Sequence, residues 1–157
     1  MHKTLLRVIG RAQESWHIEA VESYLDRLSP FQKLELIELP EGHGGSAKPD
    51  LAKTRKLEAE SLLKGIPSDA FVVALDETGT QYDSQTFAKK FGSWTEGGRT
   101  VVFIIGGSWG LDASVRDRAD VTLSLSDLTL PHLMARVVLL EQLYRAETIL
   151  NGKTYHK

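Results

Sequence analysis

Apolar and polar positions along the chain alternate between two kinds of pattern. Runs such as 5–9 and 101–105 are short and almost continuously apolar, which is typical of buried strands. Between such runs, apolar residues recur every three or four positions, as Trp16, Ala20 and Tyr24 do, which indicates amphipathic helices. The pattern predicts strands at 5–9, 34–39, 70–75, 101–105 and 121–125, and helices at about 16–28, 50–64, 84–94, 114–118 and 132–150.

The order of these elements indicates the fold class. Strands that alternate with helices are typical of an α/β fold with a mainly parallel sheet and helices on both of its faces. The chain has 157 residues, the size of one ordinary domain, and no interdomain linker interrupts it. We therefore expect a single domain over 1–157, with a loop at 40–49 where three glycines and two prolines gather.

The last predicted helix, 132–150, is apolar on several sides. Leu133, Val137 and Leu140 share one side, whereas Leu139 and Leu143 lie on another, so little continuous polar surface remains. The sheet can cover only one side of such a helix. We expect a homodimer interface to cover a second side, and the alternative is a central core helix within one chain.

Composition narrows the class of protein. Apolar residues make up 41% and charged residues 25%, as in ordinary globular domains. A net charge of −2 and a pI near 6.2 exclude a strongly cationic nucleic-acid binder as a description of the whole chain. The absence of cysteine excludes disulfides and thiol catalysis, and the five histidines lack the spacing of metal ligands, so no metal is expected. No signal peptide or membrane span is visible, which predicts a cytoplasmic protein.

A glycine-rich loop, 106–110, follows the most apolar strand. It matches the G-x-S-x-G pattern of serine hydrolases, with Ser108 as the nucleophile. Only 47 residues follow Gly110, which leaves little room for the strands that carry the acid and histidine of such enzymes. Glycines at the carboxyl end of a parallel strand also let a ligand approach the backbone, and a plain strand-to-helix turn is the alternative.

A second candidate loop lies at 123–132, between the fifth strand and the last helix. Its backbone groups could bind the edge of a base-like ring, with Leu125, Leu128 and Leu130 on the faces of that ring. His132 could carry a proton there, or could serve only as a local hydrogen-bonding group. Arg136 has no i,i+4 partner in its helix, whereas Glu141 and Arg145 form a favourable pair.

Four motifs together resemble the ribosomal RNA large subunit methyltransferase H family, which are small members of the SPOUT class of knotted methyltransferases. The resemblance runs along the whole chain and is most specific in the last 50 residues. The motifs occupy 104–110, 124–132, 136–146 and 155–157, with weaker similarity at 37–40 and 73–76. Trp109 falls at a position where the family varies, so the resemblance assigns it no role.

The resemblance implies an α/β fold with a C-terminal trefoil knot, and a homodimer formed through the C-terminal helix. It implies S-adenosylmethionine as methyl donor, and the N3 atom of a pseudouridine, at position 1915 of 23S ribosomal RNA, as acceptor. Because the chain is not basic overall, we expect recognition within the assembled ribosome and weak affinity for isolated RNA. Carried over by position, the donor site comprises Leu75, Gly106, Leu125, Ser126, Asp127, Leu128, Thr129 and Leu130.

Proton removal from N3 and stabilisation of the developing charge need a base and a cationic or hydrogen-bonding group. The residue types that can supply these groups are found at His132, Arg136, Tyr155 and His156. We expect Tyr155 and His156 on the acceptor side and Arg136 near charge or phosphate, with the identity of the base left open. A serine hydrolase and a non-catalytic nucleotide- or RNA-binding dimer remain the alternative functions.

Overall fold

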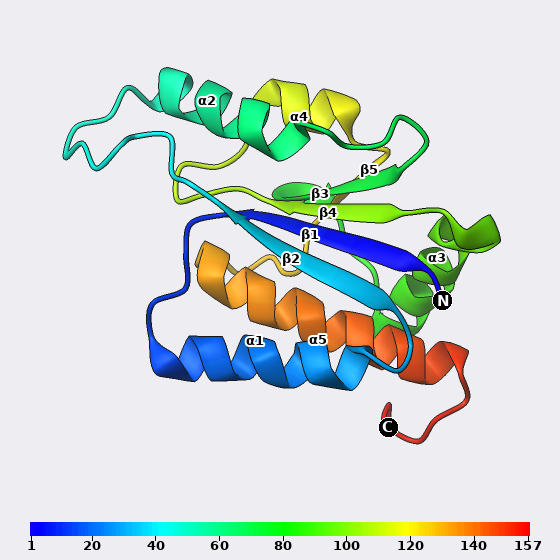
Figure 1. The fold of residues 1–157 in the computed structure, drawn as a ribbon. Helices are drawn as coiled ribbons and strands as arrows, with labels where there is room; N and C mark the ends of the chain where they lie inside the picture. The colour runs from blue at the N-terminus through cyan, green and yellow to red at the C-terminus, as the bar shows by residue number, and fades with distance from the viewer.

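The computed structural model describes residues 1–157 as a five-stranded sheet between two layers of helices (Figure 1). Every pair of neighbouring strands is parallel, in the order β2-β1-β4-β3-β5. The expected α/β class, the parallel sheet and the helices on both faces are therefore confirmed. The elements are β1 (Lys3–Ile9), α1 (Ser15–Leu28), β2 (Lys33–Leu39), α2 (Leu51–Leu63), β3 (Phe71–Thr80), α3 (Ser84–Trp94), the short 3-10 helix η1 (Glu96–Gly98), β4 (Val101–Ile105), α4 (Ala113–Arg118), β5 (Val121–Leu123) and α5 (His132–Leu150).

Two hydrophobic cores hold the layers together, one on each face of the sheet. The larger core lies under α1, α3 and α5 and includes Phe91, Phe103 and Leu140, all fully buried. The smaller core lies under α2 and α4 and includes Ile104 and Leu62. Side chains of β4 alternate between the two cores, which is why this central strand is apolar at every position.

Capping side chains begin two of the helices where the sequence indicates. Asp50 accepts a hydrogen bond from the backbone N–H of Lys53 at the start of α2, at 3.2 Å. Asp83 does the same for Thr86 at the start of α3, at 2.7 Å. Each bond satisfies a backbone donor that has no partner within its helix.

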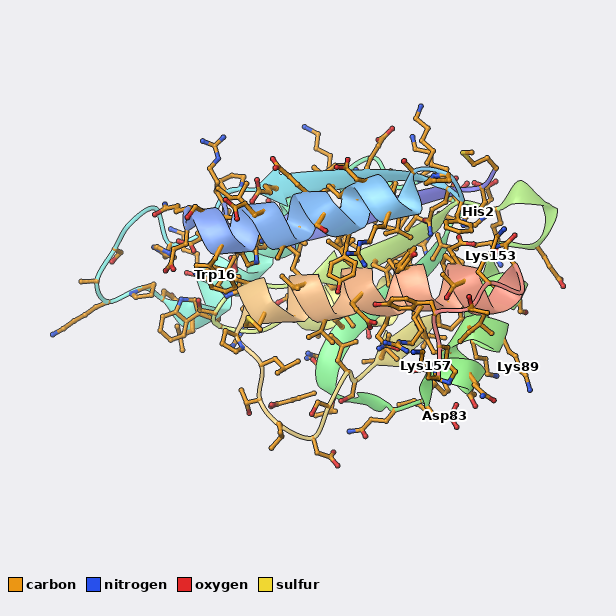
Figure 2. All side chains as sticks on the ribbon, turned by 90° about the horizontal axis from the view of Figure 1, so that it is seen from below. His2, Trp16, Asp83, Lys89, Lys153 and Lys157 are labelled. Atoms are coloured by element: carbon orange, nitrogen blue, oxygen red, sulfur yellow. The ribbon has the colours of Figure 1, made fainter.

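Helix α5 is covered more completely within one chain than the sequence argument allowed. It packs against β4, α1 and α3, and Figure 2 shows α1 and α5 side by side on this face of the molecule. Leu139, Leu140 and Leu143 are fully buried, whereas Met134 near the start of the helix is 36% exposed. The sheet covers one side of α5, as expected, but the flanking helices α1 and α3, which the sequence argument left out, cover further sides. The homodimer stays a prediction.

Strands β3 and β5 differ from their expected lengths. Strand β3 continues to Thr80 through a bulge at 76–79, and β5 ends at Leu123, two residues early. A Cβ on Gly79 would lie 2.6 Å from the carbonyl oxygen of Thr122, so only glycine lets the two segments approach this closely. The trefoil knot implied for this region stays a prediction. None of the helices combines the length and apolar character that a membrane crossing requires.

Candidate methyl-donor site

A cavity of about 640 Å³ opens at the carboxyl ends of β3, β4 and β5. Three chain segments line it: 75–77 in β3, where its regular pairing with β5 ends, 105–111 at and after the end of β4, and the loop between β5 and α5. Parallel α/β sheets bind ligands at this edge because the strand ends and helix starts present unpaired backbone groups there. Its volume lies within the range of pockets that hold small organic ligands.

The β3 side of the cavity is acidic. The Asp76 carboxylate accepts hydrogen bonds from the backbone N–H and hydroxyl of Thr78, at 2.9 and 2.6 Å, and from Arg116 at 3.2 Å. Burial opposes ionisation of Asp76, but the bonds from Thr78 and Arg116 outweigh it and lower the pKa of the carboxyl. Glu77, exposed beside it, also lines the cavity. This side therefore presents negative charge to a ligand.

The glycine-rich side is a tight turn that closes on itself. The N–H of Gly110 donates to the carbonyl of Gly107 at 3.2 Å, and Gly110 has a φ of +82°, which favours glycine. A Cβ on Gly106 would lie 2.8 Å from the Leu111 side chain and 3.1 Å from the Gly110 carbonyl oxygen. Gly106 is therefore needed so that the turn can fold back over Leu111.

The loop before α5 forms the opposite side. Ser126 organises it, because its carbonyl accepts from the Ser124 hydroxyl at 3.1 Å and its own hydroxyl accepts from the Leu128 N–H at 2.9 Å. Leu128 is 77% exposed at the rim. All the residues expected in the donor site line the cavity except Asp127, whose carboxylate accepts a bond from Gln81 at 2.7 Å.

His132, the first residue of α5, also lines the cavity. A Cβ on Gly10 would lie 3.3 Å from the His132 Nε2 atom and 3.5 Å from a Glu41 carboxylate oxygen, so both side chains lie against Gly10. Burial, followed by the positive charge of Arg136, lowers the pKa of His132. The imidazole is therefore neutral at physiological pH and able to accept a proton.

Arg136 lies inside the protein, away from the cavity lining. Its side chain is fully buried and donates to the Glu38 carboxylate at 2.9 Å and to the carbonyl oxygens of Gly10 and Ile9 at 3.1 and 3.4 Å. These bonds tie α5 to the carboxyl ends of β1 and β2. The expected contact of Arg136 with phosphate is not available in this arrangement, because the guanidinium is enclosed by its own chain.

Tyr155 and His156 fold back beside the C-terminal half of α5, against residues 141–145, and do not line the cavity. Helix α5 has 19 residues and is therefore about 28 Å long. Figure 2 shows Lys153 near the end of α5 that lies opposite Trp16, and Lys157 back along the helix. The Tyr155 hydroxyl donates to Glu141 at 3.1 Å, and Arg145 lies 3.2 Å from the His156 Nδ1 atom. The predicted pair of Glu141 and Arg145 is confirmed. Within one chain, the tail and the cavity are separate.

Sequence analysis missed a buried carboxylate behind the glycine turn. Glu58 on α2 is 3% exposed, and its Oε1 atom has no hydrogen-bond partner. A Cβ on Gly107 would lie 3.2 Å from both of its oxygens, and Gly42 donates to it across 3.4 Å. Burial raises the pKa of Glu58. In the sequence, Glu58 lies among charged residues of a helix and resembles a solvated glutamate. Its burial becomes visible only once the 40–49 loop is placed over α2.

Replacing Glu58 with glutamine is expected to stabilise the protein at pH 7.5 and not at pH 4. Because folding raises the pKa of Glu58, the native state binds its proton more tightly than the unfolded state. The contribution of Glu58 to the free energy of unfolding is therefore fully present below its unfolded pKa of about 4.3. This contribution is lost as the pH rises through the higher pKa that Glu58 has in the native state. Urea unfolding at the two pH values measures this effect, and the exposed Glu60→Gln is the matched control. Equal destabilisation by Glu58→Gln at both pH values would contradict the assignment.

Comparison with known proteins agrees with this geometry. Residues 1–156 match the family model described as "Predicted SPOUT methyltransferase". The chain is 48% identical to the ribosomal RNA large subunit methyltransferase H of Anaeromyxobacter sp. (strain Fw109-5), over 97% of this chain and 99% of that protein. It is 43% identical to the protein of the same name from Gemmatimonas aurantiaca, over 99% of each chain. A solved structure from Haemophilus influenzae Rd KW20, described as a probable methylase family protein, superposes with a TM-score of 0.56 at 15% identity, over 98% of this chain and 70% of that one, and shows a shared fold.

The match over nearly the whole chain, together with a cavity at the strand ends, defines a methyltransferase of the SPOUT class. The chain belongs to that family, and within it to the ribosomal RNA large subunit methyltransferase H family. This membership excludes the serine hydrolase and the non-catalytic dimer as descriptions of the protein. Ser108 instead lies on the exposed turn at the rim of the cavity.

Proposed function

We propose that this chain transfers a methyl group from S-adenosylmethionine to ribosomal RNA of the large subunit. The acceptor is the N3 atom of a pseudouridine in 23S ribosomal RNA, presented within the assembled ribosome, and the reaction takes place in the cytoplasm. Support comes from the family membership and from the names of relatives that match the full chain. The single observation that carries the proposal is the cavity at the carboxyl ends of β3, β4 and β5.

The lining of this cavity suits a cationic donor that contains a flat ring. Asp76 and Glu77 supply negative charge, which favours a sulfonium and an ammonium group over the phosphates of a nucleotide. Leu75, Leu125 and Leu130 supply apolar surface for the faces of a ring. The backbone of the two loops offers donors and acceptors for the edge of that ring. These features fit S-adenosylmethionine, and no metal ligand set is part of the proposal.

When bound, S-adenosylmethionine supplies an electrophilic methyl group, so the N–C bond forms as the S–C bond breaks and the N3 proton leaves. The protein's main contribution is to hold the two partners in line. His132 is our candidate for the proton acceptor, because it lines the cavity and its lowered pKa keeps the ring neutral. Arg136, which holds the first turns of α5 against β1 and β2, positions His132.

The tail would act on the site of a second subunit. Because Tyr155 bonds to Glu141, about 14 Å along α5 from His132, and no tail residue lines the cavity of its own chain, Tyr155 and His156 need a homodimer packed through α5 to reach an active site. Burial and the neighbouring Glu141 carboxylate raise the pKa of Tyr155 to about 12. Tyr155 therefore keeps its proton at neutral pH. Its hydroxyl would leave the Glu141 carboxylate and donate a hydrogen bond to the pseudouridine that receives the methyl group.

Calorimetric titration with S-adenosylmethionine tests the donor site. We expect saturable binding by the wild-type protein and a loss of affinity of at least about tenfold for Gly106→Val, which corresponds to 1.4 kcal/mol. The valine would displace the turn from Leu111 and Gly110. Gly106→Ala should give a smaller loss, because its single methyl group meets mainly the flexible end of Leu111. Absence of binding to folded wild-type protein would overturn the proposal.

A further inference from the structure

Trp109 stands at the rim of the cavity with its ring uncommitted. It occupies the third position of the turn 107–110, which the Gly110 to Gly107 hydrogen bond closes, and its side chain is 43% exposed. The other two tryptophans are engaged. Trp94 is buried and stacks on Phe71, and Trp16 donates to Glu14 and meets His17 edge-on. The Trp109 ring takes part in no aromatic, cation–π or hydrogen-bonding contact within the chain.

Two arginines flank the turn that carries this ring. Arg55 on α2 donates to the carbonyl oxygen of Trp109 at 3.3 Å. Arg116 on α4 donates to the carbonyl of Leu111, immediately beyond the turn, at 3.2 Å. The electrostatic influence of both arginines reaches Asp112, which lowers the pKa of that carboxyl after the stronger effect of its bonds to Ser114. Arg116 is already paired with the Asp76 carboxylate at 3.2 Å, so the Arg55 guanidinium is the cation available beside the exposed indole.

We infer that Trp109 and Arg55 form a docking site for the ribosomal RNA, in which the indole stacks on a nucleobase next to the target nucleotide and the Arg55 guanidinium binds the adjoining phosphate. An exposed aromatic ring beside cationic side chains is the arrangement with which proteins bind single-stranded nucleic acid. The ring lines the same cavity as the donor-site residues, so a base stacked on it lies beside the reacting nucleotide. This inference rests on the proposed function.

The turn 107–110 places the Trp109 ring at the rim of the cavity, so a base can stack on the ring while the cavity stays open. Trp109 and Leu128 are the strongly exposed apolar side chains of the rim, one on the β4 side and the other on the loop before α5. The hydrogen bond and the left-handed Gly110 fix the backbone of the Trp109 side of this rim. Because this backbone is already fixed, only the side-chain torsions of Trp109 lose freedom when a base stacks on the ring, which limits the entropic cost of binding.

Steady-state methyl transfer to ribosomes that lack the mark tests the stacking. We expect Trp109→Ala to raise the KM for ribosomes about 5- to 150-fold, the range found for the loss of one base stack. Trp109→Tyr should retain most of the affinity because it keeps an aromatic ring. The dissociation constant for S-adenosylmethionine, measured by calorimetry, should be unchanged in both variants.

Salt dependence tests the phosphate contact. Arg55→Gln should reduce the slope of log affinity against log salt concentration by about one, as expected when one phosphate contact is lost. Arg99→Gln is the matched control, because Arg99 lies at the amino end of β4, where it bonds to the Asp69 carbonyl and covers Phe71. This control should leave the slope unchanged.

The possible outcomes separate the inference from the proposed function. An unchanged KM for Trp109→Ala would overturn the proposal that the indole stacks on a base, and so would an equal rise in KM for Trp109→Tyr. Neither result would contradict methyl transfer by the protein. Weaker donor binding by Trp109→Ala would place the ring in the donor site and also overturn it. The loss of affinity should persist when binding to free 23S rRNA, and not methyl transfer, is measured at low salt, and a loss confined to whole ribosomes would indicate a ribosomal protein as partner. Absence of methyl transfer by the wild-type protein would instead contradict the proposed function.

Discussion

Deletion of residues 154–157 is expected to lower methyl transfer at least about 100-fold, the usual contribution of positioned acid–base groups, and to leave donor binding unchanged. The deletion removes Tyr155 and His156, which the proposed dimer brings to the acceptor side of the neighbouring active site. The cavity is formed by residues 75–135 and does not include the tail. Tritium transfer from labelled S-adenosylmethionine to ribosomes measures the first effect, and calorimetry measures the second.

Mixed dimers show which subunit supplies the tail. We expect the tail deletion and His132→Ala to be nearly inactive separately. When equal amounts are mixed and allowed to exchange subunits, half of the dimers are mixed, and one site in each then has both His132 and a tail from its neighbour. About a quarter of the wild-type activity should therefore return. If no activity returns from a mixture that light scattering shows to be dimeric, the tail does not act across the interface.

Arg136→Ala is expected to lower the free energy of unfolding by about 3 kcal/mol, as the loss of one partner from a buried ion pair usually does. The substitution leaves the carbonyl oxygens of Ile9 and Gly10 without their donor and removes the partner of Glu38. Arg136→Lys should restore only part of this loss, because an ammonium group cannot reach all three acceptors in the geometry of a guanidinium. Urea unfolding followed by circular dichroism measures both variants.

Arg145→Ala provides the matched control on the same helix. Arg145 pairs with Glu141 four residues earlier, but its side chain is 24% exposed. Partly solvated pairs of this kind contribute about 0.3–0.5 kcal/mol. If Arg136→Ala were as mild as Arg145→Ala, the guanidinium would not hold α5 against β1 and β2, and the positioning of His132 would need another explanation.

The positions of most elements follow from the sequence because strands and helices differ in the pattern of their apolar residues and several elements have their own boundary residues. Short, almost continuous apolar runs mark strands such as β4, and apolar residues that recur every three or four positions mark amphipathic helices such as α1. Asp50 and Asp83 begin helices where predicted. Two of the loops that line the cavity, 106–110 and 123–132, could also be marked from the sequence because loops after parallel strands gather at one edge of the sheet, whereas Leu75 was expected only from the family resemblance. Asp127 is the exception, since a neighbouring residue in sequence can face away and bond to Gln81.

The burial of Arg136 and Glu58 and the cover of α5 depend on contacts between residues far apart in the sequence. The local pattern of apolar residues does not predict such contacts. Arg136 looked unpaired in its helix, yet its partner Glu38 lies 98 residues earlier on β2. Glu58 becomes buried only when the loop that carries Gly42 folds over α2. The cover of α5 by α1 and α3 likewise requires the order of the strands, because that order decides which helices become neighbours.

Methyl transfer to defined acceptors tests the central claim most directly. Ribosomes that lack the modification, and 23S rRNA extracted from them, are incubated with the protein and tritiated S-adenosylmethionine. We predict rapid incorporation into the ribosomes at N3 of one pseudouridine, as identified by mass spectrometry, and little incorporation into the free rRNA. A chain with a net charge of −2 has no overall electrostatic attraction to RNA that the ribosome does not present. No incorporation into ribosomes, or equal incorporation into naked rRNA, would contradict this account.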